Sequence, residues 1–142
     1  MVTQLELGWL AGIIDGEGSV LILKRGNLYI PSVKMANTSK VLIEKFCDIL
    51  DRLDVSYSCY GKHKPGNRKY QWEVNIDGGK RVMSLLLQIQ DILVYKQKQA
   101  FKVMEWIESR KINKRRYYSD AELQLKDDVK LMNARGRSAS EN

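Results

Sequence analysis

Leu10-Ala11-Gly12-Ile13-Ile14-Asp15-Gly16-Glu17-Gly18 is the stretch that decides the fold of this chain. The apolar residues that lead into it, uninterrupted by proline, predict a helix over residues 5–16. Glycine recurs at every fourth position, at Gly8, Gly12 and Gly16, and so lies along one face of that helix. Glycine costs about 1 kcal/mol relative to alanine inside a helix. A stripe of glycines therefore indicates close approach by the backbone of a second helix.

Two acids, Asp15 and Glu17, stand among glycines where this helix must end, and residues 19–25 then read as a strand. Two carboxylates at a glycine-rich helix end can hold a hard divalent cation. The alternative is a buried helix that ends in a solvated acidic turn. Spacing alone favours that alternative, so the metal interpretation depends on the particular string of residues.

The composition points to a basic, single-domain protein. The chain has 142 residues, enough for one domain with its own core, and carries a net charge of +7. Such a charge indicates a polyanionic partner, although ribosomal and membrane-surface proteins share it. There is no secretion signal or membrane-spanning apolar stretch, so we expect an intracellular protein. Cys47 and Cys59 lack metal spacing, and the single histidine, His63, excludes a multi-histidine zinc site.

Hydrophobic periodicity predicts helices and two hairpins along the rest of the chain. The predicted elements are helix 5–16, strands 19–25 and 29–37, a helix capped by Ser39, strands 56–61 and 69–77, and helices 80–93, 96–111 and about 119–134. Strand 69–77 alternates strictly, so one of its faces is buried and the other polar. This order predicts an α+β fold with helices covering one face of an antiparallel sheet. After residue 134 we expect a disordered tail.

The stretch from Leu10 to Gly18 closely resembles the signature motif of the LAGLIDADG homing endonucleases, with Glu17 as the second acid. A second string, Tyr95-Lys96-Gln97-Lys98-Gln99-Ala100, is similar to one found in single-motif members of that family. The resemblance implies the αββαββα fold with a saddle-shaped sheet over residues 1–111. It leaves residues 112–142, a basic joint with a C-terminal helix and tail, without a clear counterpart. It also implies a homodimer that meets along Gly8, Ala11 and Gly12.

The same resemblance implies a catalytic set of Glu17, Asn37, Lys96 and Asp15. Glu17 and the Gly16 carbonyl would bind Mg²⁺, or Mn²⁺ or Ca²⁺ in the same site, while Asp15 mainly braces the helices. Asn37 would orient water, and Lys96 would stabilise charge around the phosphate. The residues alone are equally compatible with Asn37 as a turn residue before a helix. They also allow Lys96 to be no more than a solvated helix start.

The open face of the sheet is the expected DNA-binding surface, since a major groove accepts a two-stranded ribbon. The period-two pattern places on it Leu21, Leu23, Arg25, Ile30, Ser32, Lys34, Tyr57, Cys59, Lys69, Gln71, Glu73 and Asn75. A cationic loop with Lys62, Lys64 and Arg68 is expected to hold phosphates rather than read sequence. The loop lacks the Lys-Ser/Thr pair of a phosphate-binding loop, so we expect no nucleotide cofactor. The alternative is an ordinary solvated sheet face.

Together these patterns and the resemblance predict a homodimeric, Mg²⁺-dependent, site-specific DNA endonuclease, encoded in a mobile intron or intein and acting on host DNA. It would cut both strands of a long, nearly palindromic site and leave 3′ overhangs. The alternatives are a non-catalytic DNA-binding regulator or an RNA-splicing maturase on the same fold. A small, basic ribosome-associated protein is a more distant one.

Overall fold

The computed structural model describes residues 1–63, 69–113 and 117–141, with side chains up to residue 134 of the last helix. The elements are α1 (Gln4–Glu17), β1 (Gly18–Arg25), β2 (Leu28–Asn37), α2 (Lys40–Arg52), β3 (Ser58–His63), β4 (Tyr70–Asp77), α3 (Gly79–Ile89), α4 (Gln97–Ile112) and α5 (Asp120–Glu141). The predicted α+β class and the order of its elements are confirmed. Lys64 and Arg68, expected to contact phosphates, lie outside the described residues.

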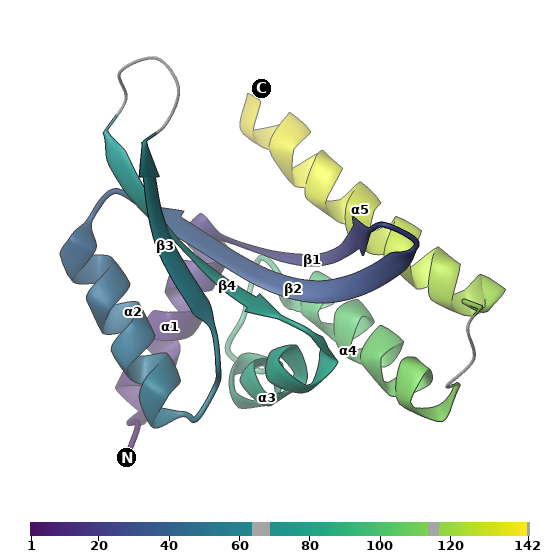
Figure 1. Ribbon diagram of the computed structural model, residues 1–142, viewed down its shortest axis with the longest axis horizontal. Helices are drawn as coiled ribbons and strands as arrows, with labels where there is room; N and C mark the ends of the chain where they lie inside the picture. Colours follow the sequence, from purple (N-terminus) through teal and green to yellow (C-terminus); the bar gives the residue numbers. More distant parts are fainter. Residues whose placement is uncertain (64–68, 114–116, 142) are drawn as a thin grey trace.

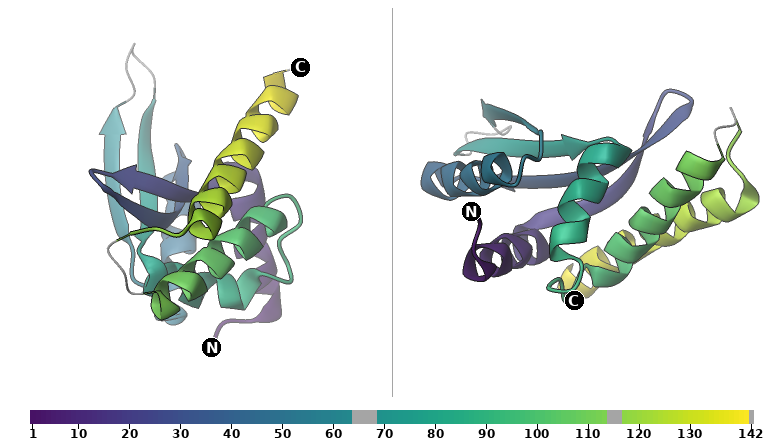
Figure 2. Two further views of the ribbon diagram at one scale, coloured as in Figure 1. Left: turned by 90° about the vertical axis from the view of Figure 1, so that its right-hand side faces the viewer. Right: turned by 90° about the horizontal axis from the view of Figure 1, so that it is seen from below.

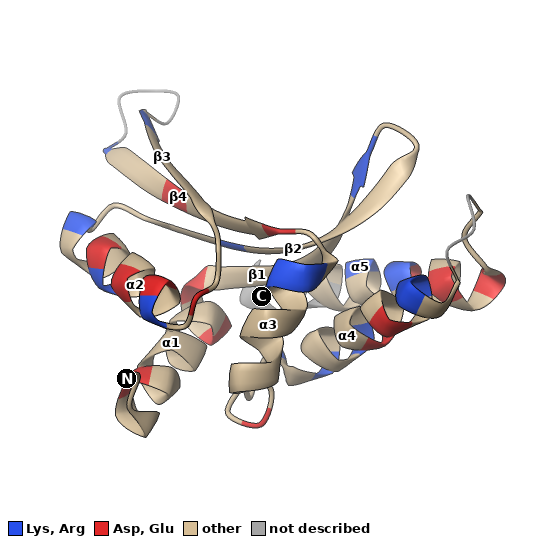
Figure 3. Cartoon of the chain, turned by 60° about the horizontal axis from the view of Figure 1, so that its bottom comes forward, with Lys and Arg blue, Asp and Glu red and all other residues tan. Residues whose placement is uncertain are grey.

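The four strands form one antiparallel sheet in the order β1-β2-β4-β3. Helices α1 to α4 lie against one side of it, and the opposite side is left open, as Figures 1 and 3 show. The open side is curved into a saddle, with the two hairpins rising at its ends (Figure 3). The layered arrangement expected from the sequence is therefore present.

Alternation along the strands explains why the helices cover only one side. Val20, Val33, Met35, Val74 and Ile76 all point toward the helices, and none is more than 2% exposed. They pack with the apolar sides of the helices in one continuous core. Burying each such side chain stabilises the fold by roughly 1.5–3 kcal/mol.

The helix-capping signals in the sequence act where they are expected. Thr3 and Glu6 form a capping box that starts α1, and the Ser39 hydroxyl accepts a hydrogen bond from the Leu42 N–H at the start of α2.

The β1–β2 turn needs Gly26, whose φ of +61° is disfavoured for residues with a side chain. Among the described residues, no helix is long and apolar enough to cross a membrane.

The last helix, α5, packs along α4 and against β1, the outermost strand on that side of the sheet (Figure 2). The Asn133 amide donates to the Val20 carbonyl at 3.1 Å, and Val129 is buried beneath. The buried carboxylate of Glu122 accepts from Ser109 and Arg110 of α4. α5 continues to Glu141, past the predicted end at about residue 134, where the sequence predicts a disordered tail.

Candidate functional site

Glu17 is the last residue of α1, and β1 begins at the next residue, Gly18. Its side chain is exposed, and it forms no hydrogen bond or ion pair with any residue that the structure describes. Gly18 allows this sharp passage from helix to strand, because a Cβ there would lie 2.9 Å from the Ile14 carbonyl oxygen and 3.1 Å from that of Lys34. The junction thus presents an unpaired carboxylate next to closely packed backbone.

Asp15 braces the junction from the other side. Its two carboxylate oxygens accept hydrogen bonds from the backbone N–H groups of Val94 at 2.8 Å and Lys96 at 2.9 Å. These contacts tie the segment between α3 and α4 to the end of α1. The carboxylate of Asp15 is therefore occupied by backbone donors, in contrast to that of Glu17.

Lys96 lies beside the same helix end. Its Nζ donates to the Asp15 backbone carbonyl at 2.6 Å and sits 5.1 Å from the centre of the Tyr95 ring. Burial lowers the pKa of Lys96, and the charge of Asp15 only partly opposes that shift. The lysine predicted from the second motif thus converges with Asp15 and Gly16, although 80 residues separate it from Gly16 in the chain.

A pocket of about 410 Å³ opens at this junction. It is lined by Asp15, Gly16, Gly18, Ser19, Leu21, Tyr95, Lys96, Gln99, Met132 and Asn133. Sequence reasoning does not identify Ser19, Gln99 or the two α5 residues as part of the site. Gln99 stands inside the Lys-Gln-Lys-Gln string, which is a usable signal, whereas no pattern in α5 indicates where that helix docks.

Asn37 ends β2 at the same end of the sheet, since Gly18 pairs with Met35 two residues earlier. Its side-chain oxygen accepts from the Ser39 N–H at 2.8 Å, which is the turn role that the sequence also allows. Its amide nitrogen has no partner among the described residues. Asn37 can therefore serve the turn and still donate a hydrogen bond outward.

Strand register defines the open side, which we call the concave face. Its residues include Leu21, Leu23 and Arg25 of β1, Ile30, Ser32 and Lys34 of β2, Ser58, Tyr60 and Lys62 of β3, and Gln71, Glu73, Asn75 and Asp77 of β4. The predicted sides of β1, β2 and β4 are therefore confirmed. Lys69, which precedes β4, is exposed.

The prediction that Tyr57 and Cys59 share this face is wrong. β3 begins at Ser58, which pairs with Asn75, so alternate residues from Ser58 onward face the open side and Cys59 faces the helices. Tyr57 packs against the core, where burial and the neighbouring Asp51 raise the pKa of its phenol. Tyr60 takes the place on the concave face that the sequence assigns to Tyr57.

Ion pairs organise the centre of the concave face. Glu73 lies 3.1 Å from the Lys62 Nζ and 3.8 Å from the Lys34 Nζ. Burial acts to raise the pKa of Glu73, but Lys62 and the other neighbours outweigh it and the pKa is lowered. Lys62 is thus part of β3 and paired across the sheet, rather than part of the cationic loop.

The amides of β4 are less accessible than their alternation suggests. Gln71 is 9% exposed and Asn75 is 6% exposed, because cross-strand neighbours lie beside them. The Asn75 amide donates to the Tyr60 hydroxyl at 3.4 Å. The more exposed polar groups on this face are Arg25, Lys34 and Lys62.

The glycine stripe of α1 faces away from the chain's own core. A Cβ placed on Gly8, Gly12 or Gly16 would meet nothing within 4 Å. Ala11 does not belong to that stripe, because it is 1% exposed and packs in the core one helical face away. Its predicted place in a dimer interface is therefore wrong, whereas the glycines remain open to a partner.

Removing Asp15 should loosen the junction. We expect Asp15→Ala to lower the free energy of unfolding by about 1–3 kcal/mol, because two backbone N–H groups lose a charged acceptor. Chemical denaturation measures this loss. Asp91→Ala, which removes an exposed acid from the same segment, is the matched control. Equal effects of the two substitutions would contradict the bracing role.

Comparison with known proteins places this geometry in a family. The fold is similar to that of the homing endonuclease I-CvuI in complex with its target, with 24% identity, a TM-score of 0.68, and coverage of 91% of this chain and 82% of that one. An archaeal intron-encoded homing endonuclease complexed with DNA matches with 16% identity and a TM-score of 0.66, over 90% of this chain and 84% of that one. At these identities the likeness shows the shared fold.

Sequence comparison adds a relative and a family. An uncharacterised protein of Methanocaldococcus jannaschii is 44% identical over 57 residues, which is 40% of this chain and 22% of that protein's length. The family model described as a LAGLIDADG-like domain matches residues 4–93. That match covers well over half of the chain and includes the motif at the end of α1, so the chain belongs to the LAGLIDADG-like domain family.

Proposed function

We propose that this chain is a site-specific endonuclease that cuts double-stranded DNA as a homodimer and leaves 3′ overhangs. The main support is the end of α1, where Gly16 and Lys96 line one pocket. Glu17, whose carboxylate has no partner among the described residues, stands in the chain between two residues of that lining, Gly16 and Gly18, without lining the pocket itself. That pocket adjoins the concave face through Leu21, which belongs to both. The proteins of similar fold are homing endonucleases bound to DNA, and one of them is intron-encoded, which supports an intron or intein origin as part of the same proposal.

The residues at this junction suit a magnesium ion. Glu17 and the Gly16 carbonyl offer hard oxygen donors, and Mg²⁺ keeps several waters while taking one or two carboxylates together with substrate phosphates. The described residues contain no cluster of three or more metal-ligating side chains, so a site here is completed by other oxygens. In this proposal they would be oxygens of water, of DNA phosphates and of the partner's copy of the junction. Mg²⁺ or Mn²⁺ bound here would supply a nucleophilic water at neutral pH and neutralise the leaving oxygen. Ca²⁺ would occupy the same site through the same oxygen ligands.

Three further residues have separate roles in the proposed site. Lys96 acts on the scissile phosphate, Asp15 positions Lys96, and Asn37 acts on water. The Lys96 ammonium, held at the Asp15 carbonyl, offsets the negative charge that develops on the phosphoryl oxygens. Asp15 fixes the backbone from which that lysine projects, so little reorganisation is needed during the reaction. The free amide nitrogen of Asn37 donates to water at the edge of the site.

A homodimer supplies the second cut. One chain carries one Glu17, and a duplex break needs two strands to be hydrolysed. Two copies of α1 that meet along Gly8, Gly12 and Gly16 place their helix ends, and therefore both copies of Glu17, near a common two-fold axis. The open space over each glycine supports this contact.

The concave face is the proposed DNA-binding surface. It combines cations for phosphates with half-buried apolar side chains, Leu21, Leu23 and Ile30, that suit thymine methyl groups. The net charge of +7 favours the same polyanion. The proposal gives Lys69, which is exposed just before β4, a phosphate contact rather than a base contact.

We expect Lys69→Ala to weaken binding to every DNA sequence by a similar factor. One phosphate contact is lost per chain, so the slope of log affinity against log salt falls by about one per chain. Titrations at several salt concentrations measure the slope. Gln71→Ala, two residues along, removes no charge and should leave the slope unchanged. An unchanged slope in Lys69→Ala would remove this residue from the interface.

The decisive experiment exposes a pool of randomised duplex DNA to the protein with Mg²⁺ and recovers molecules cut on both strands. The proposal expects one enriched, nearly palindromic site and product ends with 3′ overhangs. Enrichment by binding without cleavage would instead support a DNA-binding regulator. If the protein bound none of the duplex DNA in the pool but bound structured RNA, the result would support an RNA-splicing maturase.

A further inference from the structure

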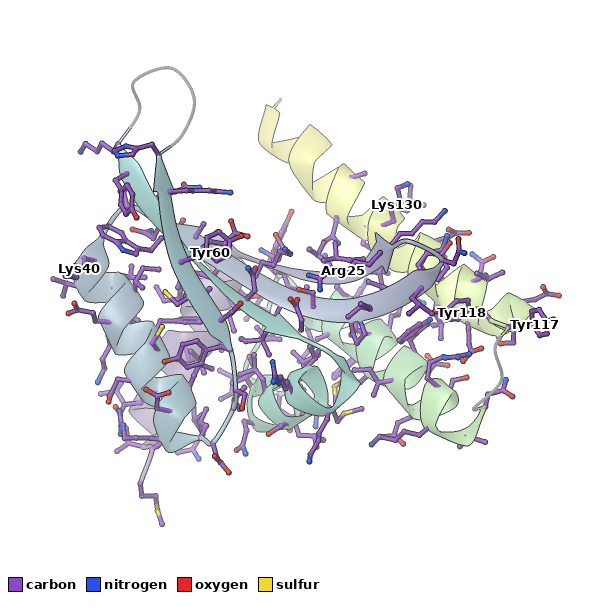
Figure 4. The ribbon with its side chains drawn as sticks, viewed as in Figure 1. Arg25, Lys40, Tyr60, Tyr117, Tyr118 and Lys130 are labelled. Carbon is purple, nitrogen blue, oxygen red and sulfur yellow. The ribbon has the colours of Figure 1, made fainter. Side chains whose placement is uncertain are left out.

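Three strands contribute one connected group at the end of the concave face nearest the β1–β2 hairpin. The Ser32 hydroxyl of β2 donates to one carboxylate oxygen of Asp77 on β4 at 2.5 Å. The Arg25 guanidinium of β1 donates to the other oxygen at 3.0 Å. Figure 4 labels Arg25, whose side chain lies over the sheet. The alternation of β4 places Asp77 on this face, but the sequence assigns it no role.

One end of this group is buried in the sheet and the other end is exposed to solvent. Ser32 is fully buried, whereas the side chains of Asp77 and Arg25 are 25% and 51% exposed. Partial burial acts to raise the pKa of Asp77, but the hydrogen bond from Ser32 and the charge of Arg25 outweigh it, so the pKa is lowered. The carboxylate is thus held charged and in a fixed orientation beneath the guanidinium.

The two contacts of Asp77 contribute differently to the fold. Ser32 is fully buried, so Asp77 satisfies its hydroxyl and thereby stabilises the fold. The exposed pair with Arg25 contributes little to folding, and fixing an arginine side chain costs rotamer entropy. A carboxylate on a surface that meets DNA also repels phosphates. The contact with Arg25 is therefore the part of this arrangement that folding stability does not explain.

We propose that Asp77 is a positioning residue that holds Arg25 to read a guanine in the major groove, an inference that rests on the proposed DNA-binding function. The ion pair uses one N–H of the guanidinium, and the other N–H groups have no partner among the described residues. Two of them match the O6 and N7 acceptors of guanine, which is the commonest specific arginine contact. Because Asp77 fixes the guanidinium beforehand, less freedom is lost when the base is bound.

The test begins with the full chain and a pool of randomised duplex DNA, selected by binding in Ca²⁺. The selected duplex is then titrated with the wild type and variants against a panel of single base-pair substitutions. Arg25→Ala should relax the preference for guanine at one symmetric pair of positions. Asp77→Ala should lower the guanine preference about 10- to 100-fold at that same pair and nowhere else. The variant that carries both Asp77→Ala and Arg25→Ala should lose no more of the guanine preference than Arg25→Ala alone.

Glu44→Ala is the matched control, since it removes an exposed carboxylate from the Lys40–Glu44 pair on α2 and changes the net charge equally. It should preserve every base preference. The thermal unfolding midpoint of each variant shows whether the protein is still folded, so a lost base preference can be distinguished from a lost fold. The inference fails if the folded Asp77→Ala protein keeps its guanine preference, loses all preferences alike, or adds its effect to that of Arg25→Ala. A wild type that selects no DNA sequence would overturn the DNA-binding function as well.

Discussion

We expect that replacing Glu17 by glutamine abolishes cleavage of the selected duplex in Mg²⁺ while specific binding persists. An amide is a poor ligand for Mg²⁺, and losing the cation removes several kcal/mol of transition-state stabilisation. The rate should therefore fall by roughly a thousandfold or more. The Glu17 side chain is exposed and makes no contact with the described residues, so the substitution should leave the fold intact.

Cleavage is measured on the selected duplex with Mg²⁺, and binding is titrated with Ca²⁺ in its place. Glu44→Gln, the same chemical change on the exposed side of α2, should cut at the wild-type rate. Near-normal cutting by Glu17→Gln would remove Glu17 from the catalytic site. Loss of binding together with cutting would assign Glu17 to DNA recognition instead.

We expect leucine at Gly12 to convert the proposed dimer to monomers. Two bulky side chains would enter the closest part of the proposed helix contact, and overpacking costs about 1–3 kcal/mol at each site. Within a single chain the new side chain has room, since nothing lies within 4 Å of a Cβ there. Leucine also favours the helix by several tenths of a kcal/mol relative to glycine. The folded monomer is thus kept while association is lost.

The mass in solution, measured over a range of protein concentrations, reports this change. Gln88→Leu adds the same side chain to an exposed position of α3 and should remain dimeric. A stable dimer of Gly12→Leu would show that association uses another surface. Double-strand cleavage should fall together with dimerisation, because each chain carries a single Glu17.

The parts of the fold set by local pattern are predictable from the sequence. The alternation of residues 69–77 determines the two sides of β4, and the apolar periodicity of α2 determines which side of that helix is buried. The end of α1 and the lysine beside it follow from their motifs. Each of these depends on residues close together in the chain.

The errors arise where tertiary contacts decide. Tyr57 is misplaced because β3 begins at Ser58, and a shift of one residue reverses the side on which each side chain lies. Ala11 follows Leu7 and Leu10 into the core, since the glycine stripe is one face away. The contact of Asp77 with Arg25 spans 52 residues, and no local period predicts it.

The docking of α5 on β1 has a consequence for the order in which the molecule is completed. The bond from Asn133 to the Val20 carbonyl joins residues 113 positions apart, so β1 is synthesised long before the helix that covers its outer edge. An uncovered strand edge is a template for pairing with another chain. During translation that hazard lasts until α5 has left the ribosome, and contacts of such long range also form late and slow folding. The edge of β1 is therefore exposed to mispairing in the interval before α5 emerges.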